Sequence, residues 1–327
     1  MDDFNIAHDR VLASGRLTLG LMTPLARQPG ALADLDLERL AAKEADRQGF
    51  ASLWTRDVPL MVPQGADGES AALDDPFLWL SALGAVTRQT ALGMAAAVLP
   101  LRSPLHLAKS SLSLDRMTGG RFILGLGSGD REAEFAAFGI DAAQRAEIFR
   151  DHWNILRAAL SPVAHERKAL RDATGGFDVL TTPAARVPML VVGSARQTLQ
   201  WIAANAQGWA SYHRDEVRQQ GRVALWQSAL AERAAGLKKP FIQSLHLELV
   251  DDPSAPVEPI ELGVRTGRIA LTDYLQRLEV VGVAHVLLHL ARGPRSVLDI
   301  VEELGAEVLP HFRSPMARGA HEAAVPA

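Results

Sequence analysis

The sequence contains no cysteine among its 327 residues. A disulfide framework, a zinc–thiolate site, an iron–sulfur cluster and a cysteine nucleophile are therefore excluded, because each requires a thiol. An excess of charge of one sign is also missing, since 34 basic and 38 acidic side chains leave a formal net charge of −4. Such a chain has no basic field that would attract nucleic acid or anionic lipid, so we expect neither as a partner.

Long apolar runs are absent as well. The stretches 91–101 and 284–290 are the longest nearly apolar ones, and both are much shorter than the roughly 20 residues that cross a bilayer. The N-terminal segment MDDFNIAHDRVLASG is polar and acidic, whereas a secretion signal has a basic start and an apolar centre. We therefore expect a cytoplasmic protein.

What the sequence does contain is an alternation, repeated eight times, of a short apolar run and an amphipathic segment. The strand candidates are 17–25, 52–55, 91–99, 122–126, 189–192, 209–212, 241–249 and 284–290. Eight such pairs without a break in composition predict a single α/β domain over 1–327, a (β/α)8 TIM barrel with insertions. A doubly wound open sheet is the alternative, because periodicity does not distinguish a closed sheet from an open one.

Four segments fall outside the repeat. They are an N-terminal tail at 1–15, insertions or loops at 161–187 and 251–265, and a C-terminal tail at 313–327. In both α/β architectures the active site lies beyond the carboxyl ends of the strands. We therefore expect the functional residues among those that directly follow the strands.

A glycine-rich segment, Gly125-Leu-Gly-Ser-Gly-Asp130, follows the fourth strand candidate. It departs from the dinucleotide fingerprint GxGxxG at Asp130, and that fingerprint belongs after the first strand of its unit. Glycines that allow a tight exit from the strand, with bare backbone near a ligand, are the better interpretation.

The segment Gly193-Ser-Ala-Arg-Gln-Thr198 follows the fifth strand candidate and leads directly into a helix. Free backbone N–H groups at a helix start, two hydroxyls and the cationic Arg196 suit a phosphate group. An equally simple interpretation makes Ser194 an ordinary helix N-cap.

The sequence contains no further motif that predicts a catalytic or metal site. Neither HExxH nor GxSxG occurs, which disfavours the hydrolases that use them, and no spacing predicts a metal site. His246 and His289 fall in strand candidates, where one face of the strand points into the barrel. The usual role of such a histidine is that of a hydrogen-bonded core residue rather than a functional one.

One continuous block of about fifty residues resembles the bacterial luciferase-like flavin monooxygenases in order and spacing. It comprises 92–100, Ser103-Pro-Leu-His-Leu-Ala-Lys109, Leu114-Asp-Arg-Met-Thr-Gly-Gly-Arg-Phe122, 125–129 and Glu134-Phe-Ala-Ala-Phe-Gly139. The likeness continues in the segments 192–194 and 207–209, and it runs from the first strand to about residue 213. The C-terminal third is similar only in its barrel rhythm.

The resemblance implies a barrel that binds FMN, or in some relatives a deazaflavin, with the phosphate after the fifth strand. The cofactor-binding residues it implies are Ala95, Ala96, Ser128, Gly193, Ser194, Ala195, Arg196 and Thr198. Ala95 and Ala96 match a non-proline cis peptide that presses against the flavin in similar proteins. Ser128 stands where luciferase has an arginine that contacts the phosphate, and Arg196 is the substitute for that charge.

A second departure concerns catalysis. The family usually has an acidic residue followed by a catalytic histidine after the second strand, whereas this sequence has Asp57 and then Val58. Arg56 and Asp57 remain as the catalytic candidates, and the alternative for them is a surface ion pair at the end of a strand. The expected substrate-pocket lining is Met22, Trp54, Met61 and Met94, together with the loop 251–265.

The function implied by the resemblance is that of an FMN-dependent monooxygenase or oxidoreductase, which uses reduced flavin and O2 on a small organic substrate. A flavin reductase is the candidate partner, with reduced nicotinamide as the indirect electron source. The alternatives are a deazaflavin-dependent hydride-transfer enzyme and a flavin-binding protein without turnover. Relatives are commonly dimers, so we expect a homodimer, and the apolar residues Phe77, Trp79 and Leu80 are offered as its interface.

Overall fold

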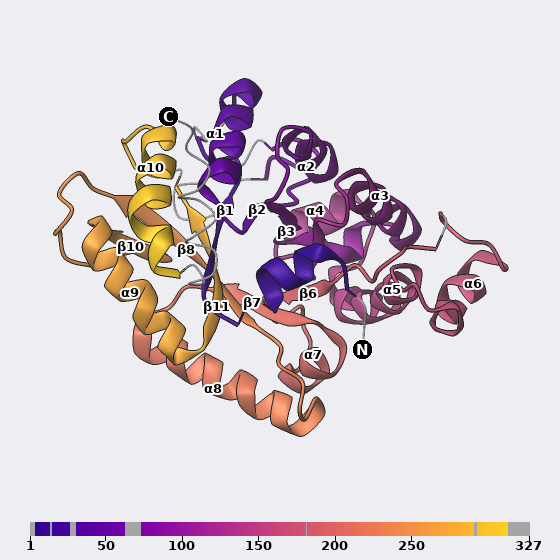
Figure 1. Ribbon diagram of the computed structural model, residues 1–327. Helices are drawn as coiled ribbons and strands as arrows, with labels where there is room; N and C mark the ends of the chain where they lie inside the picture. The colour runs from indigo at the N-terminus through magenta and orange to yellow at the C-terminus, as the bar shows by residue number, and fades with distance from the viewer. Residues whose placement is uncertain are drawn as a thin grey trace.

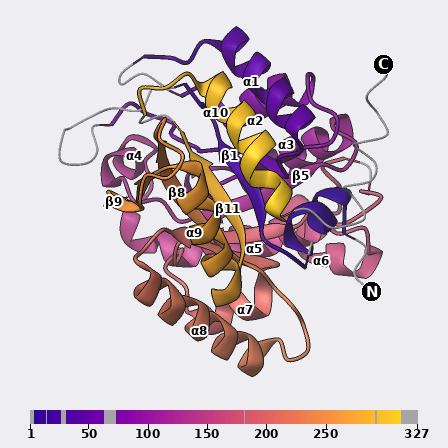
Figure 2. The same ribbon diagram turned by 60° about the vertical axis from the view of Figure 1, so that its left-hand side comes forward.

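The computed structural model is a barrel of eight parallel strands with helices around it (Figures 1 and 2). The structure describes residues 4–13, 15–26, 31–62, 73–180, 182–290 and 293–312. The barrel strands are β1 (Thr18–Met22), β2 (Ser52–Thr55), β3 (Ala91–Met94), β5 (Phe122–Gly127), β6 (Met189–Val192), β7 (Gly208–Tyr212), β8 (Phe241–Leu249) and β11 (Val283–His289). Because β11 pairs with both β8 and β1, the sheet is closed, which confirms the barrel and excludes the open sheet.

Helices follow the strands in the predicted alternation and form the outer layer in Figure 1. They are α1 (Leu35–Gln48), α2 (Pro76–Gly84), α3 (Pro104–Met117), α4 (Glu132–Ala137), α5 (Arg145–Ala159), α6 (Lys168–Thr174), α7 (Leu199–Asn205), α8 (Glu216–Arg233), α9 (Arg268–Val281) and α10 (Val297–Glu303). Local sequence explains their ends. In α1, the Asp34 carboxylate accepts hydrogen bonds from the backbone N–H groups of Asp36 and Leu37, and Gly49 ends the helix in the left-handed conformation at φ 84°.

The core has two layers because side chains alternate between the faces of each strand. Outward-facing side chains such as Leu19, Leu53 and Leu124 pack against the helices in one large apolar cluster. A smaller cluster, which includes Met22 and Trp54, fills the interior of the barrel. The barrel is therefore a packed body whose functional groups have to lie at its rim.

The N-terminal segment differs from the expected tail. Residues 6–12 form helical turns, and Ala7, Val11 and Leu12 are buried in the interior cluster of the barrel. The Ala7 N–H donates to the carbonyl of Gly120, which lies just before β5 begins. The segment, indigo in Figure 1, thus closes the end of the barrel where the strands start. The sequence does not indicate this burial, because polar residues separate Ala7 from Val11 and Leu12.

The segment 251–265 is also more regular than the expected loop. It contains β9 (Glu258–Ile260) and the start of β10 (Gly263–Thr266), which pair with each other in antiparallel fashion. β10 in turn pairs with the last residues of β8. The segment 161–187 lies between α5 and β6 and holds α6, which projects from the barrel in Figure 1. The expected C-terminal tail at 313–327 lies outside the described residues.

Helix α2 contradicts the expected interface. Phe77, Trp79 and Leu80 are all buried in the outer core, because they face the barrel, and are not available to a partner. Leu78 on the opposite side of α2 is 73% exposed. Among the described residues, no helix combines the length and the apolar character that a membrane crossing requires.

Candidate active site at the barrel mouth

The carboxyl ends of β3 and β5 form a floor of small residues at the mouth of the barrel. Ala95, Ala96 and Gly127 are partly exposed, whereas Met94 and Ala97 on either side of the two alanines are completely buried. A Cβ atom added to Gly127 would lie 3.4 Å from the Ala96 Cβ atom. The floor therefore carries no side chain larger than a methyl group, and a flat ligand can lie directly on it.

The Ala95–Ala96 peptide bond is cis, as the resemblance implied. Hydrogen bonds to β2 and the residues after it hold the two alanines in place. The Ala95 N–H donates to the Thr55 carbonyl at 2.8 Å, and the Asp57 N–H donates to the Ala96 carbonyl at 3.3 Å. The break between β3 and the short β4 (Ala97–Val98) lies at this point, so the predicted strand 91–99 is divided in two.

Trp54 and Met22 support the floor from inside the barrel. They are only 1% and 4% exposed and belong to the interior cluster. The Trp54 indole lies against Gly93, where an added Cβ atom would come within 2.2 Å of the ring. Both residues are therefore a layer below the open surface, and neither lines the wall of the open mouth in this structure.

Met94 does not line the mouth, which corrects the expectation. It is completely buried and belongs to the outer cluster, together with Leu92 and Leu124. The reason is the alternation along β3, in which Gly93 occupies the inward position and Met94 faces the helices. Met61, by contrast, is 59% exposed.

A buried histidine completes the layer below the floor. His285 on β11 accepts or donates hydrogen bonds at both ring nitrogens, to Thr18 Oγ1 at 2.7 Å and to Ser52 Oγ at 2.8 Å. The Trp54 indole N–H also points to its Nε2 atom at 3.2 Å. Burial lowers the pKa of His285 to about 3, so the ring is neutral at ordinary pH. This residue has the structural role that is usual for a strand histidine.

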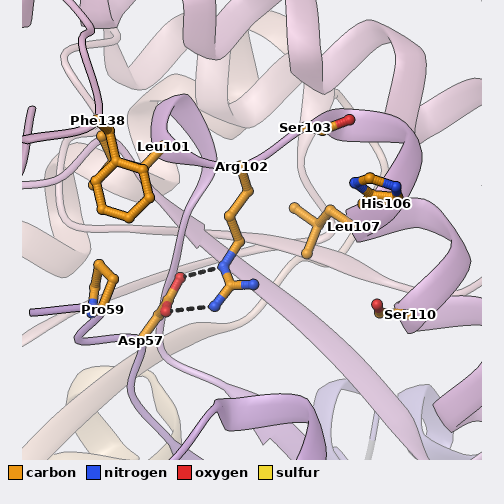
Figure 3. A pocket seen from close by; sticks show the side chains of 9 residues that line it. All are labelled: Asp57, Pro59, Leu101, Arg102, Ser103, His106, Leu107, Ser110 and Phe138. Carbon is orange, nitrogen blue, oxygen red and sulfur yellow. Dashed lines mark hydrogen bonds and ion pairs between the residues drawn. The ribbon is translucent and has the colours of Figure 1, made fainter.

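Asp57 is bound by Arg102 rather than by its neighbour Arg56 (Figure 3). The Arg102 guanidinium donates from Nε at 2.6 Å and from Nη2 at 2.7 Å, one bond to each carboxylate oxygen, and the Val98 N–H adds a third bond at 3.0 Å. The bond to Asp57 raises the pKa of Arg102 despite its partial burial. We call Asp57, Arg102 and Val98 the clamp, because they join the end of β2 to the segment after the floor.

The clamp changes the interpretation of the two polar residues after β2. A surface ion pair at the end of the strand was the expected alternative, but the Asp57 carboxylate is buried, since Asp57 is only 4% exposed, and its cation comes from far along the chain. No sequence signal near Asp57 indicates that Arg102 is its partner. Arg56 is partly buried and lies just beyond the end of β2, two residues after Trp54. A cavity of about 290 Å³ lies behind the clamp, next to Pro59 and Phe138 (Figure 3).

The segment after β6 forms an open loop with three left-handed residues. Gly193, Ala195 and Arg196 have φ values of 67°, 46° and 58°. The Ser194 hydroxyl accepts a hydrogen bond from the Arg196 N–H at 3.2 Å, whereas Thr198 caps α7 by accepting from the Trp201 N–H at 3.2 Å. The proposed N-cap role of Ser194 is therefore wrong.

The loop after β6 is attached to the barrel by its backbone, while most of its side chains are exposed. Ser194, Arg196 and Thr198 are exposed, while Ala195 is 3% exposed. The carbonyl of Gly193 accepts a hydrogen bond from the Trp209 indole at 2.7 Å. Ser128, at the end of β5, is 8% exposed. These residues follow β5 and β6, which are adjacent strands of the barrel, so they lie on the same side of the mouth.

The mouth also carries two histidines, on β8, which is four strands from β3 around the barrel, and on its neighbour β11. His246 on β8 and His289 on β11 are partly exposed, and their ring centroids are 4.7 Å apart. Their strand positions were visible in the sequence, but their contact depends on the closure and register of the barrel. Among the described residues, no group of three or more His, Asp or Glu side chains is arranged to hold a metal ion.

Comparison with known proteins agrees with this architecture. A family model for luciferase-like monooxygenases matches residues 16–274, and the chain belongs to this family. It is 31% identical over 143 residues to 4-hydroxyprotoasukamycin monooxygenase of Streptomyces nodosus subsp. asukaensis, a match that covers 44% of this chain and 36% of that protein. It is 26% identical over 137 residues to the alkanal monooxygenase alpha chain of Photorhabdus luminescens, with 41% and 38% covered. The chain thus spans less than half of the length of these two relatives.

Solved structures show the same fold at low identity. An F420-dependent secondary alcohol dehydrogenase, solved with an F420–acetone adduct, has a TM-score of 0.69 at 15% identity, with 91% of this chain and all of that chain covered. The oxygenating constituent of 3,6-diketocamphane monooxygenase from Pseudomonas putida, solved with FMN, has a TM-score of 0.67 at 16% identity, with 92% of this chain and all of that chain covered. Flavin-type cofactors of two kinds therefore occur on this fold.

Proposed function

We propose that the protein is an FMN-dependent oxidoreductase that uses reduced flavin and O2 on a small organic substrate. The observation that carries this proposal is the floor of Ala95, Ala96 and Gly127, which is open, flat and free of side chains larger than methyl. An isoalloxazine ring needs such a surface, and the interior cluster below keeps water out of it.

The phosphate of the cofactor would bind at the loop after β6. Ser194 and Thr198 offer hydroxyls, and the exposed Arg196 supplies a cation. Gly193 shapes the loop through its left-handed backbone, since its own N–H already donates to the Ala210 carbonyl at 2.8 Å. Ala195 contributes its backbone, and Ser128 approaches from the end of β5. Bound reduced flavin supplies the redox chemistry, and the chain supplies position and exclusion of water.

The clamp assigns Asp57 a positioning role in this proposal. Its carboxylate accepts three hydrogen bonds, so it is unsuited to exchange a proton with a substrate. It holds the segment that follows Ala96, and thereby the floor. Arg56, the other polar residue directly after β2, stays a catalytic candidate in this proposal.

A deazaflavin-dependent hydride transfer is the second candidate. It is favoured by Val58, which is 8% exposed and replaces the histidine that is usual in the family, since hydride transfer needs no oxygen chemistry at that position. For the FMN-dependent function we propose two further features. A flavin reductase that uses reduced nicotinamide supplies the reduced flavin, and the protein is a homodimer.

Oxygen uptake tests the two candidates. We expect the purified protein, supplied with photoreduced FMN and a panel of small organic compounds, to consume O2 faster than free reduced FMN and to release less hydrogen peroxide. A protein that leaves both rates unchanged but exchanges hydride with reduced deazaflavin would support the second candidate. Flavin binding with neither activity would indicate a non-catalytic flavin-binding protein.

A further inference from the structure

A second pocket lies at the end of the barrel where the strands start, the end that carries the indigo N-terminal segment in Figure 1. It has a volume of about 630 Å³, and Arg186, Gln207 and Lys239 line it just before the neighbouring strands β6, β7 and β8 begin. Small-molecule sites usually have volumes of roughly 300–1,000 Å³. No residue of the floor or of the loop after β6 lines this pocket, so it is separate from the proposed flavin site.

The charged lining of the pocket is mostly positive. Among the described residues that line it, four cations, Arg157, Arg186, Lys238 and Lys239, stand against one carboxylate, that of Glu166. Positive side chains around one pocket repel one another and attract anions. An anionic ligand would therefore supply the charge that the lining lacks.

Two of these cations are held in place by the fold and two are not. The Arg186 guanidinium pairs with Glu166 through Nη2 at 2.8 Å, and the Lys239 ammonium donates to a main-chain carbonyl of α7 at 2.6 Å. Arg157 and Lys238 are exposed and make no hydrogen bond or ion pair within the part of the chain that the structure describes. These two side chains can close on an anion without breaking a described contact.

Two amide side chains in the same pocket each use one polar atom and leave the other available. The Gln207 Oε1 atom accepts the Met189 N–H at 2.9 Å, and the Asn205 Nδ2 atom donates to the Trp201 carbonyl at 2.9 Å. Gln207 Nε2, a donor, and Asn205 Oδ1, an acceptor, have no partner among the described residues. A donor and an acceptor close together suit the edge of a nucleobase, which presents the complementary groups.

The rest of the lining includes aromatic and apolar side chains. Phe4 stacks on His8 with the ring centroids 4.3 Å apart, and Leu160 and Leu237 also line the pocket. Apolar walls with a few placed polar groups are typical of sites for organic ligands. The pocket therefore suits a ligand that combines a flat heterocycle with an anionic group.

We propose that this pocket binds a nucleoside diphosphate. The phosphates lie among Arg157, Arg186 and Lys238, and the base lies beside Asn205 and Gln207. Because β7 separates β6 from β8, the main chains at the starts of these two strands are roughly 10 Å apart, which two linked phosphates span better than one. This binding goes beyond the proposed flavin chemistry and does not depend on it.

Calorimetric titration of the purified full chain, without added flavin, tests the proposal with ADP, inorganic pyrophosphate and adenosine. We expect saturable binding of ADP that is at least about tenfold tighter than that of either fragment, because only ADP makes both kinds of contact. Equal affinities for ADP and pyrophosphate would show a general attraction of anions and would overturn the proposal. Absence of ADP binding would overturn it as well.

Substitutions of the two exposed cations locate the binding. Arg157→Ala and Lys238→Ala should each weaken ADP binding at least about fivefold, since each removes one charge-assisted contact to phosphate. Lys43→Ala removes an exposed cation from α1 and should bind ADP as the wild type does. ADP binding that is lost in Ser194→Asp but kept in the Arg157 and Lys238 variants would place the nucleotide at the loop after β6 and contradict the proposal.

Discussion

At the scale of single residues, the strand histidines differ by their depth in the barrel. His285 lies in the lower layer, is completely buried and has polar partners at both ring nitrogens. His246 and His289 lie higher on the same wall and are partly exposed. The sequence does not distinguish them, because alternation gives the face of a strand but not the height at which water enters.

This difference predicts a pH dependence of stability. His285 has a pKa of about 3 in the folded protein and an ordinary value of 6.5 when unfolded. Its contribution is therefore fully present above pH 6.5 and is lost as the pH falls toward 3, by about 1.4 kcal/mol per pH unit. In His285→Gln, urea unfolding between pH 6.5 and 4 should show a shallower loss of the free energy of unfolding than in the wild type.

The exposed His165→Gln is the matched control for this measurement, and it should keep the wild-type slope. His213, whose pKa is lowered to about 4 mainly by burial, contributes a similar slope in all three proteins and cancels in the comparison. Parallel curves for His285→Gln and the wild type would contradict the assignment.

At the scale of elements, the clamp connects β2, β4 and the start of α3. Asp57 follows β2, Val98 belongs to β4, and Arg102 lies just before α3, so one carboxylate fixes three segments around the floor. Loss of the carboxylate leaves Arg102, whose side chain is 27% exposed, without its main partner. The clamp should therefore contribute to both stability and cofactor binding.

Asp57→Asn tests this contribution. We expect it to lower the free energy of unfolding by about 2 kcal/mol or more, since one member of a largely buried ion pair is removed, and to weaken FMN binding. Asp172→Asn removes an exposed partner of Lys168 and should cost less than about 1 kcal/mol. Chemical denaturation and flavin titration measure the two effects. Equal costs for the two variants would show that the clamp is not a stabilising element.

The alternation of strands and helices was predictable from the sequence because it depends on local periodicity. The boundaries of β2, β6 and β8 match the expected ones, and the cis Ala95–Ala96 bond follows from the resemblance. The partner of Asp57, the buried side of Phe77 and the outward orientation of Met94 were not predictable. Each depends on which face of an element meets another element, and that is fixed only when the barrel closes.

At the scale of the whole molecule, the barrel has the proposed flavin site at one end only. The segment 4–13 and the insertion with α6 lie toward the end where the strands start, while the floor, the clamp, the loop after β6 and the two histidines of the mouth surround the opposite end. This division agrees with the general rule for such barrels. It predicts that changes in cofactor binding come from one end of the molecule only.

The most direct test of the account is a titration of the purified protein with FMN and deazaflavin, followed by flavin fluorescence and absorbance. We expect saturable binding of FMN that falls at least about tenfold in Ser194→Asp, because a carboxylate in the loop after β6 repels a phosphate. Ser228→Asp, an equal change of charge on the exposed face of α8, should bind as the wild type does. Binding of neither cofactor, or equal binding by both variants, would contradict a flavin site at this mouth.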